Sequence, residues 1–161
     1  MNDVKKARVE QAALEARRRM RKHLVSLHHC LARSDVMRHH HDALIQEMTD
    51  SDDPSAFTNV KKARFSAYIA FWFTGLAGVI ERYEQLRDKG AVPASSEIDV
   101  LLTDDFKDVL KPFRNSVAHC SDHDDHRTLE IFDHEATVPD QATAIAQAFH
   151  GYFHAYNPTR T

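Results

Sequence analysis

Apolar residues recur every three or four positions along most of this chain, and this period constrains the fold more than any other feature. The clearest run lies between about Lys62 and Lys89. One face of this segment carries Phe65, Ile69, Trp72, Leu76, Val79, Tyr83 and Leu86. Apolar residues also fill the other faces around 67–73, which predicts a central, buried helix. Gly90 is placed to end that helix in the left-handed conformation, and Pro93 prevents its continuation.

Two helices are predicted before this central one. The first is a long basic helix over about 3–31, and the second is a shorter helix over about 36–48. The run 49–55 is rich in Asp, Ser and Pro and is typical of a turn or loop. The first helix is expected to present one continuous apolar stripe, formed by Val9, Ala13, Ala16, Met20, Leu24, Leu27 and Leu31.

Three more helices are predicted after Gly90. Ser96 can cap a short helix through Leu102, and Thr103 can cap the next one. Pro112 predicts a kink or a restart within that helix. Its expected inward residues are Phe106, Leu110, Phe113 and Val117. The last helix, over about 139–156, is expected to present Ile145, Phe149, Tyr152 and Tyr156.

Composition supports one all-α domain over 1–161, a helical bundle of four or five main helices. The 161 residues are 42% apolar and 28% charged, as in a soluble globular protein, and include only 4 Gly and 5 Pro. The two cysteines are too few for a disulfide framework. The charged N-terminus lacks a secretory leader, and the most apolar stretch, 67–80, is too short to span a bilayer. We therefore expect a cytoplasmic protein without a membrane partner.

Charge is unevenly distributed although the net charge is only −3. Residues 1–22 hold eight Lys and Arg, whereas residues 99–140 hold eleven Asp and Glu against four Lys and Arg. The basic segment could contact a phosphate backbone. A solvated helix face explains the same run. The candidate phosphate contacts are Arg17, Arg18, Arg21 and Lys22.

A group of catalytic residue types occurs near the end of the helix that Thr103 begins. Asn115 and His119 are four residues apart, so on an ideal helix their side chains lie on one side, away from the apolar face. Arg114 lies on the flank between the two sides. Histidine can act as a general acid or base near neutral pH, and arginine can stabilise the growing charge of a phosphate. These residue types suit phosphodiester chemistry and need no metal.

The stretch LKPFRNSVAHC, residues 110–120, resembles the signature of HEPN domains (higher eukaryotes and prokaryotes nucleotide-binding), most often R-N-x-x-x-H. The likeness extends in pattern over about 62–135, but only the six-residue motif is specific. The resemblance implies a helical bundle that forms a homodimer, in which two motif helices face each other across one composite cleft. It also implies a metal-independent endoribonuclease that leaves a 2′,3′-cyclic phosphate and a 5′-hydroxyl.

The same resemblance implies roles for individual residues. His119 would activate the ribose 2′-hydroxyl or protonate the leaving oxygen, Arg114 would stabilise the transition state, and Asn115 would position His119 or the phosphate. Ser116 and Glu81 are expected to be supporting residues. Glu81 could pair with Arg114, or it could be an exposed carboxylate beside Arg82 or Arg87. No cofactor is implied. The partners would be RNA and, as in toxin–antitoxin and defence systems, an antitoxin or regulatory protein.

Two other interpretations remain open. The chain contains 12 histidines, including the pair His150 and His154 at helical spacing, which suits a metal-binding protein. However, the sequence has no C-x-x-C or H-E-x-x-H motif, and consecutive histidines on a helix point in different directions. The chain could also be a non-catalytic module for dimerisation or for RNA or nucleotide binding, in which RNSVAH forms only a polar contact between protomers.

Overall fold

The computed structural model describes residues 2–50, 58–119 and 138–156, and the side chains of 4–50, 58–113 and 138–156. Within these ranges the chain forms helices and no strand, which confirms the predicted all-α bundle. The helices are α1 (Asn2–Thr49), α2 (Asn59–Asp88), α3 (Ser96–Leu101), α4 (Asp104–His119) and α6 (Val138–Tyr156).

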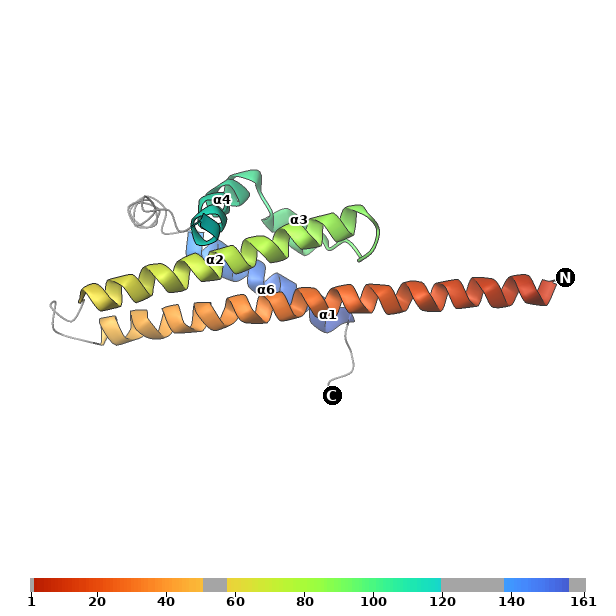
Figure 1. Cartoon of the computed structure of the whole chain (residues 1–161), viewed down its shortest axis with the longest axis horizontal. Coiled ribbons are helices and arrows are strands. Elements are labelled where there is room, and N and C mark those ends of the chain that lie inside the picture. The colour runs from red at the N-terminus through yellow and green to blue at the C-terminus, as the bar shows by residue number, and fades with distance from the viewer. Residues whose placement is uncertain (1, 51–57, 120–137, 157–161) are drawn as a thin grey trace.

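The two longest helices, α1 and α2, form an antiparallel hairpin (Figure 1). Gly75 of α2 lies directly against Ser34 of α1, because a Cβ added to Gly75 would be only 2.9 Å from the Cβ of Ser34. At the same point the Ser34 hydroxyl donates a 2.8 Å hydrogen bond to the backbone carbonyl of Trp72. The hairpin is therefore held by close backbone approach together with a buried polar contact.

The predicted boundary between helices over 3–31 and 36–48 is wrong, since α1 is continuous from Asn2 to Thr49. Ser34 and Asp35 are residue types that often end helices, but here both are buried and bond to other helices. Ser34 bonds to α2, and Asp35 accepts a 2.5 Å hydrogen bond from Nε2 of His150 on α6. Their polar side chains are satisfied by tertiary contacts, so the helix does not have to end.

Helix α2 is the centre of the bundle, as its pattern predicted, and contacts α1, α4 and α6. Its predicted inward residues are buried, except that Phe65 is half-buried. By length and composition α2 could also cross a membrane: its most apolar 18-residue window has a mean hydropathy of 1.3, and 39% of that window is buried. The stretch 67–80, predicted to be the most apolar, is shorter than this 18-residue window. The packing on three sides is typical of a core helix.

The left-handed cap predicted at Gly90 is confirmed by its φ of 63°. The amides of Gly90 and Ala91 donate to the carbonyls of Arg87 and Leu86 at 2.8 Å each, which completes the helix end. The Tyr83 hydroxyl then accepts a 2.8 Å hydrogen bond from the amide of Ser95. This bond fixes the start of α3 against α2, and burial raises the pKa of Tyr83.

Several predicted helix ends need correction. Ser95, rather than Ser96, caps α3 by accepting a hydrogen bond from the amide of Ile98. Thr103 caps α4 as predicted, and its hydroxyl accepts from the amide of Phe106 at 3.3 Å. Helix α4 runs through Pro112 as one element, so the restart considered there does not occur. Helices α2 and α6 begin at Asn59 and Val138, slightly before their predicted starts.

The predicted apolar stripe of α1 is buried only in part. Leu24, Leu27 and Leu31 lie in the core, whereas Val9 is 64% exposed and residues 4–19 are all exposed. This segment, roughly 24 Å long, extends beyond the other described helices because α2 is shorter than α1 (Figure 1). On α6, Ile145, Phe149 and Tyr152 are buried as predicted, but Tyr156 is 42% exposed. Val117 and the predicted loop 121–127 lie outside the described side chains.

Replacing Gly75 by Ala should lower the free energy of unfolding. The added methyl group would overlap Ser34, and overpacking of this kind costs roughly 1–3 kcal/mol, more than the helix-propensity gain of about 1 kcal/mol. Gly78, one turn further along α2, is the matched control, because no heavy atom lies within 4 Å of its added Cβ. Gly78→Ala should raise stability by up to about 1 kcal/mol. Urea unfolding measures both variants, and a stability gain in Gly75→Ala would contradict the close crossing.

Candidate active site

The candidate site begins with the way α4 is held on α2. Phe106, Leu110 and Phe113 are each 2% exposed and form the buried face of α4, as the sequence predicted. The ring of Phe113 meets that of Phe73 edge-on, with centroids 5.0 Å apart. The Thr74 hydroxyl also donates a 3.0 Å hydrogen bond to the carbonyl of Phe113. The residue immediately before the RNSVAH motif is thereby fixed to α2 by both its ring and its backbone.

The motif itself occupies the last turns of α4, which is helical through His119. At about 100° per residue, positions 115 and 119 fall on the side of α4 opposite the buried positions 110 and 113. Position 114 falls on the flank. The side chains of Arg114, Asn115, Ser116 and His119 lie outside the described residues, so the predicted contacts among them remain predictions.

A pocket of about 490 Å³ lies between α2 and α4, next to the motif along α4. Its apolar lining comes from Ala77, Ile80 and Leu110. Its charged lining comes from Glu81 and Glu84 on α2, and from Asp104, Lys107, Asp108 and Lys111 on α4. Glu81 is exposed and lines this pocket, and both of its predicted alternatives remain predictions. The predicted pairing of Glu81 with Arg114 involves a side chain outside the described residues.

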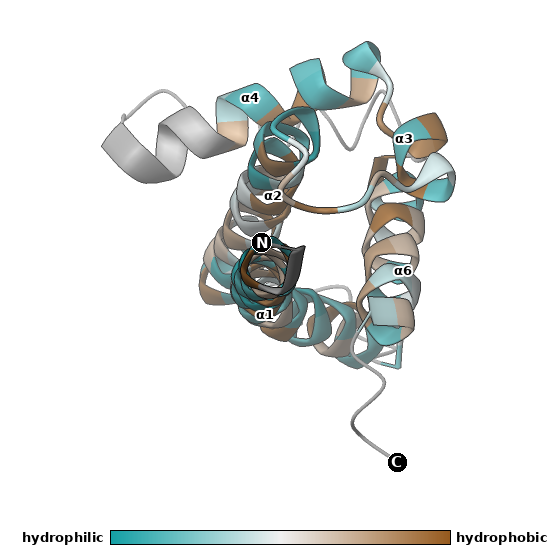
Figure 2. Ribbon diagram, turned by 90° about the vertical axis from the view of Figure 1, so that its right-hand side faces the viewer, coloured by the Kyte–Doolittle hydropathy of each residue, from teal (hydrophilic) through white to brown (hydrophobic). Residues whose placement is uncertain are grey.

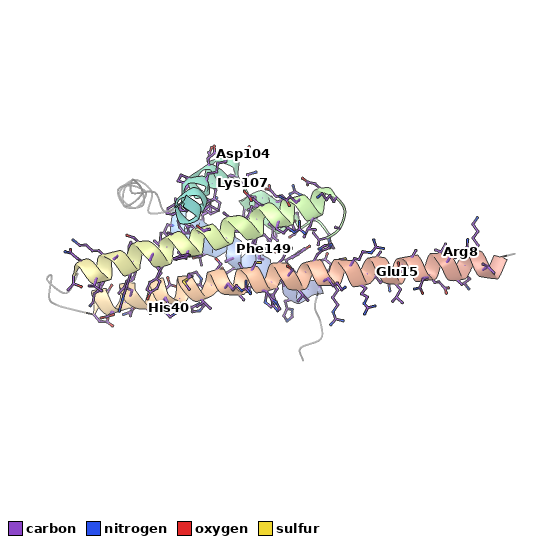
Figure 3. All side chains as sticks on the ribbon, viewed as in Figure 1. Arg8, Glu15, His40, Asp104, Lys107 and Phe149 are labelled. Atoms are coloured by element: carbon purple, nitrogen blue, oxygen red, sulfur yellow. The ribbon has the colours of Figure 1, made fainter. Side chains whose placement is uncertain are left out.

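Two acidic residues of α4, Asp104 and Asp108, form ion pairs with lysines on the same helix. Lys107 Nζ lies 2.8 Å from a carboxylate oxygen of Asp104 and 3.3 Å from one of Glu84 on α2. Lys111 Nζ lies 2.5 Å from a carboxylate oxygen of Asp108. The hydrogen bond from Lys107 lowers the pKa of the Asp104 carboxyl, and the same bond raises the pKa of Lys107. Asp104 and Lys107 lie on the far side of α2 from α1 (Figure 3).

The four predicted phosphate contacts, Arg17, Arg18, Arg21 and Lys22, lie on α1 and are all exposed. They lie where the burial of α1 begins, since residues 4–19 are exposed and Leu24 is buried. The motif belongs to α4, which lies across α2 from α1 (Figure 2). Within one chain, the structure therefore does not bring the predicted RNA-binding residues and the motif into one cleft.

The histidine-rich segments have separate partners. His39 Nδ1 lies 2.7 Å from the carbonyl of Asp35, His40 stacks on Tyr68, and His41 packs between Phe65 and Trp72. His150 bonds to Asp35, whereas His154 is exposed. Across the described part of the chain, no three His, Cys, Asp or Glu side chains converge as metal ligands. Cys120 and the histidines at 123 and 126 lie outside it.

Sequence reasoning missed Thr74 and Lys107 as residues that position α4. Thr74 is a half-buried hydroxyl within a very apolar helix, and its spacing matches no motif. Its role depends on a carbonyl 39 residues away. In the sequence, Lys107 is one of several charged residues on α4. Only the fold places the carboxylate of Glu84 within ion-pair distance of it.

Comparisons with models of known protein families, with curated proteins and with solved structures find no match to this chain.

Replacing Thr74 by Val should lower the free energy of unfolding by about 1 kcal/mol, because the carbonyl of Phe113 loses a hydrogen bond from a side chain of nearly the same shape. Thr74→Ser keeps the hydroxyl and is the matched control. Thermal unfolding of both variants measures the effect. Equal losses in the two variants would show that packing, rather than this hydrogen bond, fixes the start of the motif.

Proposed function

We propose that this protein is a metal-independent endoribonuclease of the HEPN type, with Arg114, Asn115 and His119 as its catalytic residues. One observation carries the proposal. The RNSVAH motif lies at the end of a helix whose opposite face is fixed in the core by Phe106, Leu110 and Phe113. A rigid helix can present residues four apart to one substrate atom with little conformational freedom to lose.

The proposed chemistry cleaves RNA through its own 2′-hydroxyl. His119 takes the proton of the 2′-hydroxyl as that oxygen attacks the phosphorus, or gives a proton to the departing 5′-oxygen. Arg114 stabilises the negative charge on the phosphate oxygens in the transition state. Asn115 positions either the imidazole or the phosphate. The products are a 2′,3′-cyclic phosphate and a 5′-hydroxyl, and no metal takes part.

We further propose that two copies of the chain form the active site, because the resemblance implies that two motif helices face each other across one composite cleft. Arg17, Arg18, Arg21 and Lys22 are proposed to contact the RNA backbone. Such a nuclease fits a toxin or antiviral defence effector in the cytoplasm, held inactive by an antitoxin or a regulatory partner. Glu81 supports the site from α2, where it faces the pocket beside the motif.

One observation favours a second candidate function, a non-catalytic module whose motif serves dimerisation. Asp104 and Asp105 are exposed on α4, and Asp108 lies on the next turn. Carboxylates beside the motif repel RNA. Lys107 and Lys111 pair with Asp104 and Asp108 and so offset part of this charge. This compensation is why we favour the nuclease.

Incubating the purified protein with mixed total RNA in EDTA should give fragments that end in cyclic phosphate. His119→Ala should lower the cleavage rate at least about 100-fold, the contribution typical of a general acid or base. His40→Ala is the matched control, because His40 is an exposed histidine on α1 that stacks on Tyr68 (Figure 3). It should cut RNA at the native rate.

Three results would count against this assignment. Cleavage that EDTA abolishes would indicate metal-dependent chemistry. Equal cleavage by the native protein and His119→Ala would remove His119 from the reaction. Binding of RNA with no cleavage under any condition, including removal of a co-purifying partner, would favour the non-catalytic module.

The proposed composite site also predicts the mass in solution. Sedimentation equilibrium of the purified protein should give twice the 18.4 kDa mass of one chain. Arg114→Ala should remain dimeric yet cut RNA at least about 100-fold more slowly, because the loss is in transition-state stabilisation. A fully active monomer would contradict the composite site.

A further inference from the structure

Acidic side chains are missing from two helical segments that lie against each other. Residues 16–34 of α1 and residues 141–156 of α6 contain no Asp or Glu. The α1 segment holds Arg17, Arg18, Arg19, Arg21, Lys22 and Arg33. Helix α6 contacts both α3 and α1, and its C-terminal end lies against α1 (Figure 1). This arrangement makes a positive surface on a chain whose net charge is −3.

A shallow hollow lies where these two segments meet. It is lined by Arg21, Leu24, Val25 and His28 of α1 and by Phe153 and Tyr156 of α6. Tyr156 is 42% exposed, and its ring meets that of Tyr152 with centroids 5.0 Å apart. The ring of His28 lies 5.2 Å from that of Phe153. The hollow is therefore bordered by the basic side chain of Arg21, and the exposed ring of Tyr156 lies beside other aromatic rings.

The geometry points to a binding site for single-stranded RNA, in which an unpaired base stacks on Tyr156 and the adjoining phosphates contact Arg21 and the basic turns of α1. This inference rests on the proposed ribonuclease function. It assigns RNA binding to a surface away from the motif. Aromatic rings that accept bases, beside cationic side chains that follow the backbone, are the means by which proteins bind single strands without sequence preference.

The two carboxylates that flank residues 16–34 both have cationic partners. Glu15 is exposed, and its carboxylate lies 3.5 Å from a guanidinium nitrogen of Arg19. Asp35 is buried, accepts the hydrogen bond from His150 Nε2, and lies 3.4 Å from Nε of Arg38. The ring of His150 in turn lies 6.3 Å from that of His28. Asp35 holds α6 against α1 through His150 and so positions the two sides of the hollow. It does so without an exposed negative charge that would repel a phosphate.

A single strand suits the hollow better than a duplex. The stacking surface is one exposed ring in a shallow depression, and the paired bases of a duplex cannot reach such a ring. Beside the hollow, α1 carries consecutive basic residues at 17–19 and again at 21 and 22, and Glu10 and Glu15 lie beyond them (Figure 1). A flexible strand can follow this short basic segment. An anionic membrane would use the same charges, but the exposed ring would then enter the bilayer interface rather than accept a base.

The test measures binding by fluorescence anisotropy, with a labelled single-stranded RNA in which every ribose carries a 2′-O-methyl group. This probe lacks the attacking hydroxyl, so its binding does not depend on catalysis. Tyr156→Ala should weaken binding about fivefold or more, whereas Tyr156→Phe should bind like the native protein. Arg21→Gln should weaken binding and reduce the slope of log affinity against log salt by about 0.7.

Arg64→Gln is the matched control. It removes one exposed positive charge from the start of α2 rather than from α1, and should leave affinity and salt slope unchanged. Circular dichroism should show native helicity in each variant, since Tyr156, Arg21 and Arg64 are all exposed. His119→Ala should bind the probe normally. If His119→Ala binds the probe but does not cut RNA, its loss concerns the proposed chemistry and not this surface.

Several outcomes would overturn the proposal. These are native affinity in Tyr156→Ala and Arg21→Gln, equal loss in Arg64→Gln, or no binding of the probe by the native protein. Equal affinity for a duplex of the same sequence would remove the stacking role of Tyr156. Binding to anionic vesicles with a blue-shifted Tyr156→Trp emission, and no binding to RNA, would assign the surface to a membrane instead.

Discussion

The close crossing of α1 and α2 at Ser34 and Gly75 is the constraint on which the rest of the bundle depends. A glycine in a helix interior costs about 1 kcal/mol relative to alanine, and here the missing side chain lets the two backbones approach. The Ser34 hydroxyl binds the carbonyl of Trp72 in the same contact. Because α1 is straight and continuous on both sides of this point, the crossing also determines where α6 can pack and how far α1 extends beyond α2.

From this crossing the structure divides into two parts with different chemistry. On one side, α2 holds α4 through Phe73 and Thr74, and the motif lies at the end of α4. On the other side, α1 and α6 meet through the Asp35–His150 contact. The proposed catalytic chemistry lies in the first part and the proposed binding of single strands in the second. A strand that occupies both must pass around α2 or extend to another chain.

Much of the fold could be predicted from the sequence, because α2 carries seven apolar positions at helical spacing and Gly90 marks its end. The break expected near Ser34 did not occur, since a residue type that ends helices can also bond to a neighbouring helix. Tyr156 continues the apolar spacing of α6 but is 42% exposed, because it lines an open hollow that α6 forms with α1. Spacing shows which residues share a face, whereas the partner helix decides which of them are buried.

The candidate site was less predictable than the fold. Arg114, Asn115 and His119 were predicted as catalytic residues because their types and spacing are local properties of one helix. Thr74, Lys107 and Glu84 act across α2 and α4, so no local pattern marks them. The same reason explains the hollow at Tyr156. Its two walls come from residues more than a hundred positions apart, and only the packing of α6 on α1 brings them together.

The concentration of Lys and Arg on residues 16–34 of α1, a segment without Asp or Glu, gives the molecule an electric dipole moment that its small net charge conceals. In the field of a polyanion, a dipole experiences a torque even when the net force on the molecule is weak or repulsive. The protein would turn its basic side forward while still in diffusive approach. The protein would thus take its orientation at a separation of about one Debye length from the nucleic acid, before any side chain makes contact.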